Sequence, residues 1–331
     1  MTTDPTRPAP IFVVGTPRSG TTLVRLLLDS HPDLAIAPES AFFLRLVGRC
    51  GPLYRDLCTP AAVRGLVEDA LSISAVAAWF PRDLGPEAVL ARLGGHPTPA
   101  EVTDALYSAW ASHRGKARWG DKTPRNLQHI GALLDLFPAA RIVIVMRDPR
   151  DIAVSLAKAS FAGTSAIGAA LRWATDAACA RDALATAGDA AWVLPYEGLV
   201  REPERWCAEL LSFVRAPPCP DLLDRYRHHR DDVSHALSDL YLQPVDAAAA
   251  QRWRVSGPPE VIAQVEAVVG EELARWGYEP SLPAGRVGRR ARLRARVGDA
   301  LSAARNREYM TNYRDLARLA ARRIQAYPGE G

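Results

Sequence analysis

Residues 11–22, with the sequence IFVVGTPRSGTT, decide the fold. The apolar run Ile11–Val14 is typical of a buried strand, and a leucine-rich stretch over 21–30 predicts a helix packed against a sheet. Gly15 and Gly20 lie between the strand and the helix. Their spacing is that of a loop that cradles phosphate with backbone N–H groups at a helix N-terminus. We therefore predict a strand, a phosphate-binding loop and a helix in succession.

The loop lacks the lysine that would reach the β- and γ-phosphates of a nucleoside triphosphate. Thr21 stands in its place, followed by Thr22, and the cation of the loop comes earlier, at Arg18. This pattern favours a nucleotide that has one 5′-phosphate to hold and another group to transfer. Backbone amides and the helix N-terminus are expected to grip that phosphate.

Short apolar runs alternate with helical stretches along the rest of the chain. Such alternation, with long crossovers, predicts an α/β fold: a P-loop NTPase-like parallel sheet flanked by helices. Residues 40–113 read as a helical insertion, 118–122 (RWGDK) as a short break, and 231–258 as irregular. Further strands are expected at 34–37, 141–146 and 191–194, and further helices at 123–137, 149–158, 165–187, 203–214 and 259–276.

In parallel sheets, ligands bind at the carboxyl ends of the strands. The loops after the four predicted strands carry Arg18, Glu39, Arg147 and Tyr196, which we expect to converge on one site.

Each candidate side chain also has a purely structural interpretation. Arg147 and Ser155 are suited to clamping a second phosphate, or they belong to an ordinary helix start. Glu39 is placed to take a proton from a hydroxyl, or it caps the next helix. Lys122, one of three lysines in the chain, neutralises charge on a transferring group or is a solvated surface residue.

The composition fits an ordinary soluble globular protein, with 331 residues, 48% of them hydrophobic and 24% charged. Five scattered cysteines and seven histidines show no metal-ligand spacing, so we expect no metal and a reducing, cytoplasmic compartment. No apolar run approaches 18 residues, and the polar, proline-rich start does not resemble a signal peptide.

Charge is unevenly distributed. Residues 286–331 contain twelve arginines and four acidic residues, so this end is strongly basic although the whole chain carries only +4. We expect a disordered start at 1–10, a catalytic domain at 11–282 and a basic helical tail at 283–331. A solvated helix, a homodimer contact, an acidic acceptor or an anionic membrane surface would each explain the tail, and nucleic acid is not expected.

Two stretches, GTPRSGTT at 15–22 and RIVIVMRDPRDIAVS at 141–155, resemble the two cosubstrate-binding signatures of sulfotransferases that use 3′-phosphoadenylyl sulfate (PAPS). The likeness is closest to the tyrosylprotein sulfotransferase-like branch of bacterial sulfotransferases and extends over about residues 10–281. Other shared motifs are His31-Pro32, Glu39-Ser40, Lys122-Thr123-Pro124, Leu136-Phe137-Pro138, Pro195-Tyr196-Glu197, Arg252-Trp253 and Gly277-Tyr278.

The resemblance implies how the cosubstrate would be held. The 5′-phosphosulfate would lie on the loop, formed by Thr16, Pro17, Arg18, Ser19, Gly20, Thr21 and Thr22. The 3′-phosphate would bind Arg147 and Ser155, with Tyr196 nearby and Arg252 where the branch usually has a lysine.

The resemblance also implies a reaction. Glu39 would be the general base, while Arg18 and Lys122 would stabilise charge on the sulfuryl group. The acceptor would be a hydroxyl of a carbohydrate, a tyrosine or a secondary metabolite, and no metal would be needed. The alternatives are a nucleotide or small-molecule kinase, which needs the missing lysine, and an inactive nucleotide-binding protein.

Overall fold

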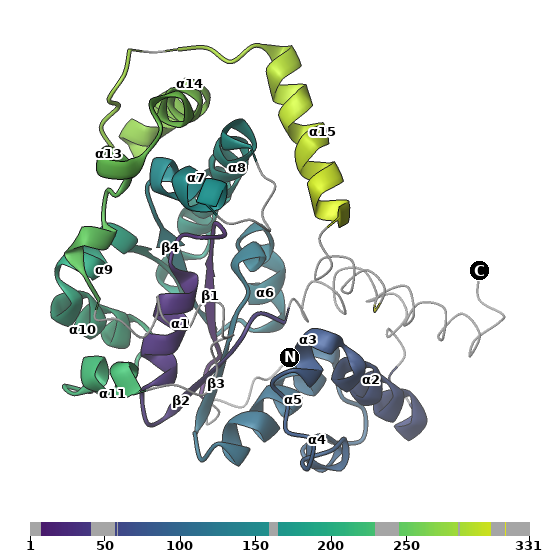
Figure 1. The fold of residues 1–331 in the computed structure, drawn as a ribbon. Coiled ribbons are helices and arrows are strands. Elements are labelled where there is room, and N and C mark those ends of the chain that lie inside the picture. Colours follow the sequence, from purple (N-terminus) through teal and green to yellow (C-terminus); the bar gives the residue numbers. More distant parts are fainter. Residues whose placement is uncertain are drawn as a thin grey trace.

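A computed structural model describes residues 8–40, 57, 59–158, 165–228, 245–283, 285–305 and 315. Its centre is a five-stranded sheet with the order β2-β3-β1-β4-β5, in which every pair is parallel (Figure 1). The strands are β1 (Ile11–Gly15), β2 (Leu34–Ala37), β3 (Arg118–Lys122), β4 (Arg141–Met146) and β5 (Ala191–Pro195). The predicted α/β class is confirmed.

Alternate residues of the central strands pack on opposite faces of the sheet. Ile11 and Val13 of β1 belong to one apolar cluster, whereas Phe12 and Val14 belong to the other. Since both faces are covered, the strands read as continuous apolar runs rather than alternating ones. The β-branched run of β4 is the clearest case.

Helices cover the two faces as separate layers (Figure 1). One face is covered by α1 (Thr21–Asp29), α9 (Tyr196–Arg201), α10 (Pro203–Phe213) and α11 (Leu222–His228). The other carries α5 (Pro99–His113), α6 (Ile130–Leu136), α7 (Pro149–Lys158), α8 (Ala166–Thr186) and α14 (Pro259–Arg275). The described part of the chain also contains α2 (Pro60–Ser72), α3 (Ser74–Ala77), α4 (Glu87–Leu90), α13 (Trp253–Ser256) and α15 (Arg289–Arg305).

A buried arginine ties α7 to the C-terminal helices. Arg150 donates to Asp148 at 2.7 Å and to Glu266 of α14 at 2.6 Å, and its guanidinium stacks 3.8 Å from the ring centroid of Trp253 in α13. Such a buried ionic group is costly to break, because the partner charges would be left uncompensated. It fixes the start of α7 at the edge where β4 ends.

The prediction that 118–122 is a short break was wrong. RWGDK forms β3, which lies between β1 and β2 and is buried along its length. Only one of its five residues is a good strand former, so local propensity gives no strand signal. Packing decides instead: a Cβ on Gly120 would lie 2.6 Å from the Ile11 carbonyl oxygen and from Ile36 Cδ1.

Other boundaries also differ from expectation. The predicted helix at 123–137 is a 3₁₀ segment over Pro124–His129 followed by α6, and the short helices α9 and α11 had no counterpart in the prediction. The 231–258 stretch is described only from residue 245, where it contains a short 3₁₀ turn and α13.

The predicted insertion and both ends of the chain are described only in part. The predicted insertion at 40–113 contains α2–α5, with 41–56 and 58 outside the described residues. Of the basic tail, α15 is described, whereas 306–314 and 316–331 are not, nor are 1–7 of the predicted disordered start. None of the described helices is long and apolar enough to cross a bilayer.

Candidate active site

The loop between β1 and α1 holds an unusual backbone. Arg18 has φ of 73° and Gly20 has φ of 103°, both in the left-handed region. A Cβ on Gly20 would overlap the ring of Tyr196, which lies against the loop, so both conformation and space demand glycine here. Strain at a non-glycine residue such as Arg18 is typical of ligand-binding loops.

The loop has features that suit a bound anion. The N-terminal turn of α1 begins directly after it, and the first N–H groups of a helix lack intrahelical acceptors. The Ser19 hydroxyl is fully buried and has no hydrogen-bond partner among the described residues. A buried hydroxyl without a partner is costly, and an anion on the loop would satisfy it.

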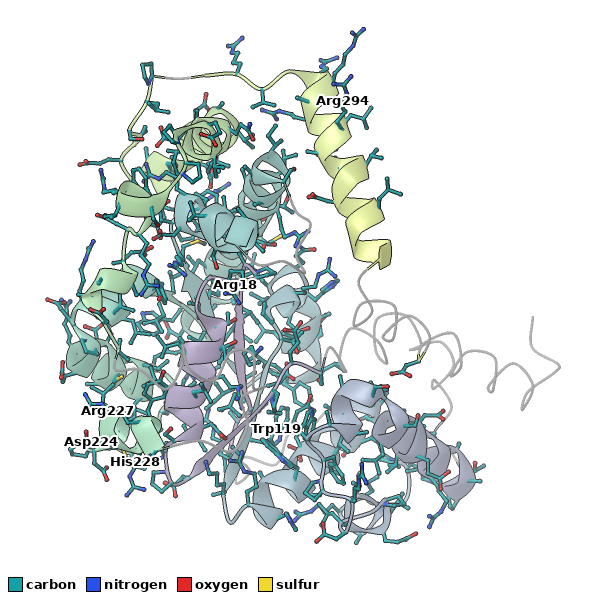
Figure 2. The ribbon with its side chains drawn as sticks, in the orientation of Figure 1. Arg18, Trp119, Asp224, Arg227, His228 and Arg294 are labelled. Atoms are coloured by element: carbon teal, nitrogen blue, oxygen red, sulfur yellow. The ribbon has the colours of Figure 1, made fainter. Side chains whose placement is uncertain are left out.

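The second predicted phosphate site lies beside the first. Arg18 Nε donates to Ser155 Oγ of α7 at 3.1 Å, and Arg147 donates to the Arg18 carbonyl at 3.2 Å. Arg147 also donates to the Ala249 carbonyl at 3.2 Å, and its guanidinium lies 4.2 Å from the Tyr196 ring centroid. Figure 2 labels Arg18 at this end of the sheet, close to α7.

Tyr196 connects this group to Arg252. Burial raises the pKa of the Tyr196 phenol, while the charges of Arg147 and Arg252 lower it. Arg252 is exposed and donates to the Ala248 carbonyl at 3.1 Å, so its charge is near the same ring but reaches solvent. Arg147 therefore stacks on the Tyr196 ring, and the charge of Arg252 acts on the same phenol.

Glu39 and Lys122 form the other half of the site. Lys122 Nζ lies 3.5 Å from Glu39 Oε2, with side-chain exposures of 10% and 49%. Lys122 ends β3 and pairs in register with Val13 of β1, three residues before the loop begins at Thr16. Burial lowers the pKa of Lys122, whereas the nearby Glu39 carboxylate raises it and the Arg25 charge lowers it further.

A buried carboxylate next to Lys122 was not predicted. Asp121 Oδ2 accepts hydrogen bonds from Tyr107 at 3.0 Å and from Ser40 at 3.2 Å, and Oδ1 accepts from Asn126 at 3.2 Å. Burial raises the pKa of Asp121 to about 6 despite these donors. Because Ser40 follows Glu39 directly, its hydrogen bond to Asp121 anchors the backbone that carries Glu39. Asp121 also directly precedes Lys122 in β3.

Arg25 is a second residue that the sequence interpretation passed over. It is almost fully buried in α1, donates to the Ile36 carbonyl at 3.4 Å and lies near Lys122. A single arginine among the leucines of TTLVRLLLDS was the signal available. For Asp121 the only signal was its place next to a rare lysine.

The structure thus places the predicted residues at one edge of the sheet, in two neighbouring groups. Of the remaining loop residues, Thr16 and Thr21 are buried and Pro17 and Thr22 are half-buried. Thr16 lies beside the buried Asp176 of α8, whose pKa is raised by burial. Cosubstrate contacts were also expected within 231–245, but of that segment only Val245 lies in the described part. Among the described residues, no three His, Cys, Asp or Glu side chains gather as a metal site would need.

Comparison with known proteins agrees with this geometry. Residues 10–221 match the family model described as "Sulfotransferase family". The chain is 28% identical to Protein-tyrosine sulfotransferase 1 of Danio rerio over 82% of this chain and 72% of that protein. It is 27% identical to Nodulation protein NoeE of Sinorhizobium fredii, over 82% and 66% of the two chains.

A solved structure shows the same fold. The sulfotransferase domain from the Synechococcus PCC 7002 olefin synthase superposes with a TM-score of 0.53 at 22% identity, covering 86% of this chain and 99% of that one. At this identity the likeness concerns the arrangement of sheet and helices only.

Proposed function

Because the chain belongs to the sulfotransferase family, we propose that it moves the sulfuryl group of 3′-phosphoadenylyl sulfate to an acceptor hydroxyl. The products are a sulfate ester and adenosine 3′,5′-bisphosphate. One observation carries the proposal: a phosphate-cradling loop without the kinase lysine shares a sheet edge with the Glu39–Lys122 pair.

The cosubstrate fits the residues at this edge. The buried Ser19 hydroxyl and the α1 N-terminus would receive the 5′-phosphosulfate, with Arg18 beside them. Arg147 and Ser155 would receive the 3′-phosphate. Arg147 Nε is buried without a hydrogen-bond partner among the described residues, which supports an anionic ligand at that guanidinium.

Glu39 is the proposed general base. Its side chain is half exposed, and the hydrogen bond from Lys122 goes to Oε2, so the carboxylate can still accept a proton from an incoming hydroxyl. When the acceptor hydroxyl gives its proton to Glu39, the acceptor oxygen bonds to sulfur and the bond from sulfur to the bridging phosphate oxygen breaks.

Charge moves to the bridging oxygen during this displacement. Lys122 and Arg18 lie at opposite sides of the β1 strand end and are proposed to stabilise that charge. Arg18 is bonded to Ser155 and Lys122 is paired with Glu39, which supports cations already placed near the reacting group.

The acceptor and the compartment are also proposals. The resemblance to a protein named as a protein-tyrosine sulfotransferase supports a tyrosine hydroxyl, and carbohydrate and secondary-metabolite hydroxyls remain in the acceptor class. Cys179, Cys207 and Cys219 are free thiols, which supports the proposal of a reducing, cytoplasmic compartment.

The direct test is transfer of ³⁵S from labelled PAPS to a panel of tyrosine peptides, oligosaccharides and phenols. We expect turnover that survives EDTA and is lost in Glu39→Gln, with the exposed Glu68→Gln as the matched control. Phosphate transfer from labelled ATP would favour a kinase. Calorimetric binding of adenosine 3′,5′-bisphosphate without turnover on any acceptor would favour an inactive nucleotide-binding protein.

A further inference from the structure

The C-terminal helix α15 presents an apolar stripe to solvent. Leu293, Val297 and Leu301 are 63%, 51% and 54% exposed, although large apolar side chains are normally buried. They are spaced four residues apart, so they lie one above another on a single helix face. A contiguous exposed apolar stripe of this kind is typical of a surface that binds a partner or a membrane.

The opposite face of α15 is the one that docks on the protein. Ala295 is buried, and the Asp299 carboxylate accepts a hydrogen bond of 3.2 Å from the Ser165 backbone N–H, at the start of α8. Asp299 also lies against Gly168, where no side chain would fit. Figure 1 shows α15 beside α8 at the periphery of the fold. Since Ala295 and Asp299 dock, the stripe on the opposite helix face points away from α8.

Arginines border the stripe. At about 100° per residue, Arg294 lies on one side of it, and Arg289 and Arg296 lie on the other. Arg290 continues the line of the stripe toward the helix start, and all four are exposed. From residue 283 to 298 the sequence has six arginines and no acidic residue. Figure 2 labels Arg294 on the outlying part of the molecule.

We propose that α15 binds the surface of an anionic lipid bilayer, lying in the plane of the membrane. The stripe of Leu293, Val297 and Leu301 would enter the acyl boundary, and the bordering arginines would contact lipid phosphates. The apolar line is narrow and the arginines are many, so electrostatic attraction to anionic lipid would supply most of the binding. The proposal is independent of the sulfotransferase reaction, since α15 contributes no residue to the candidate active site.

The charge pattern favours a bilayer over a second copy of the chain. Two stripes pressed together would bring the arginines of both helices to the edges of the contact, where α15 offers no exposed acidic residue in its described side chains. Three apolar side chains are also far less than a stable dimer needs, which is about 1,200 Å² or more. A nucleic acid would pair with the arginines but leave the apolar stripe in water.

The test is co-sedimentation of the full chain with vesicles of phosphatidylcholine and of phosphatidylcholine with 30% phosphatidylglycerol. We expect binding to the anionic vesicles only, weakening as salt rises. Arg289→Gln combined with Arg290→Gln should lower the partition coefficient about 25-fold, at about fivefold for each arginine near the surface. Leu293→Ser with Val297→Ser and Leu301→Ser should lower it at least tenfold.

Matched controls come from elsewhere on the surface. Val255→Ser removes a side chain that is 93% exposed, and Arg82→Gln with Arg92→Gln removes two exposed arginines outside α15; neither should change vesicle binding. Thermal unfolding checks that every variant is folded. The proposal is overturned if the wild type does not sediment with anionic vesicles or if the stripe variant binds them like the wild type. It is also overturned if light scattering shows a dimer that the stripe variant dissociates.

Discussion

Replacing Asp121 by Asn should change how the stability of the protein depends on pH. The carboxyl group is buried at the end of β3, and its burial raises the pKa from the ordinary 3.8 to about 6. Ionising it in the folded protein is therefore harder than in the unfolded chain. An asparagine has nearly the same shape but does not ionise, so the pair of proteins isolates this one group.

The sign and size follow from linkage. Because the folded-state pKa is raised, the contribution of Asp121 to stability is fully present below about pH 3.8 and is lost as pH rises through about 6. A shift of about two units corresponds to about 3 kcal/mol, at about 1.4 kcal/mol per unit. Roughly 2 kcal/mol of this falls between about pH 4.5 and 7.5.

Urea unfolding of both proteins at these two pH values measures the effect. The asparagine lacks one acceptor for Tyr107, Ser40 or Asn126, which lowers stability by about 1–3 kcal/mol at every pH. The penalty of the variant relative to wild type should shrink by about 2 kcal/mol from the lower to the higher pH. The exposed Asp135→Asn is the control, and a penalty for Asp121→Asn that is equal at both pH values would refute the reasoning.

Four further predictions concern the site and its frame. Glu39→Gln should lower turnover at saturating substrate by about 10²–10⁴, with calorimetric affinity for adenosine 3′,5′-bisphosphate unchanged; equal turnover would remove it as the base. Lys122→Met should lower kcat by about 10²–10³, and a change in KM alone would contradict its role. Gly20→Ala should weaken bisphosphate binding at least about tenfold, since its Cβ would overlap Tyr196; unchanged affinity would contradict this. Arg150→Met should cost about 3–5 kcal/mol in urea unfolding, and a loss below about 1 kcal/mol would show that its carboxylate partners are solvated.

Much of the fold is predictable because the relevant signals are local. β1 and β4 are runs of β-branched and aliphatic residues buried on both faces, and such runs have few alternatives. The loop after β1 was predictable because its two glycines adopt backbone conformations that other residues rarely reach, which leaves a local signal in the sequence. The convergence of Arg18, Glu39 and Arg147 then follows, since parallel strands end at a common edge.

The contacts inside the site were not predictable in the same way. Arg18 and Ser155 are hydrogen-bonded across 137 residues of sequence, and no local pattern specifies that pair. The stacking of Arg147 on Tyr196 likewise depends on how α9 follows β5, a short helix without periodicity of its own. Pairing across the fold is decided by packing, which single-sequence patterns record only indirectly.

The failure at β3 is the most informative difference. Its residues are poor strand formers because three of the five meet other demands: Gly120 makes room for Ile11 and Ile36, Asp121 holds Ser40, and Lys122 reaches Glu39. A central strand can carry such residues because its neighbours β1 and β2 supply the hydrogen bonds and the buried surface. Where local propensity is given up inside a well-packed sheet, the residues responsible are candidates for function, and here they include the proposed catalytic lysine.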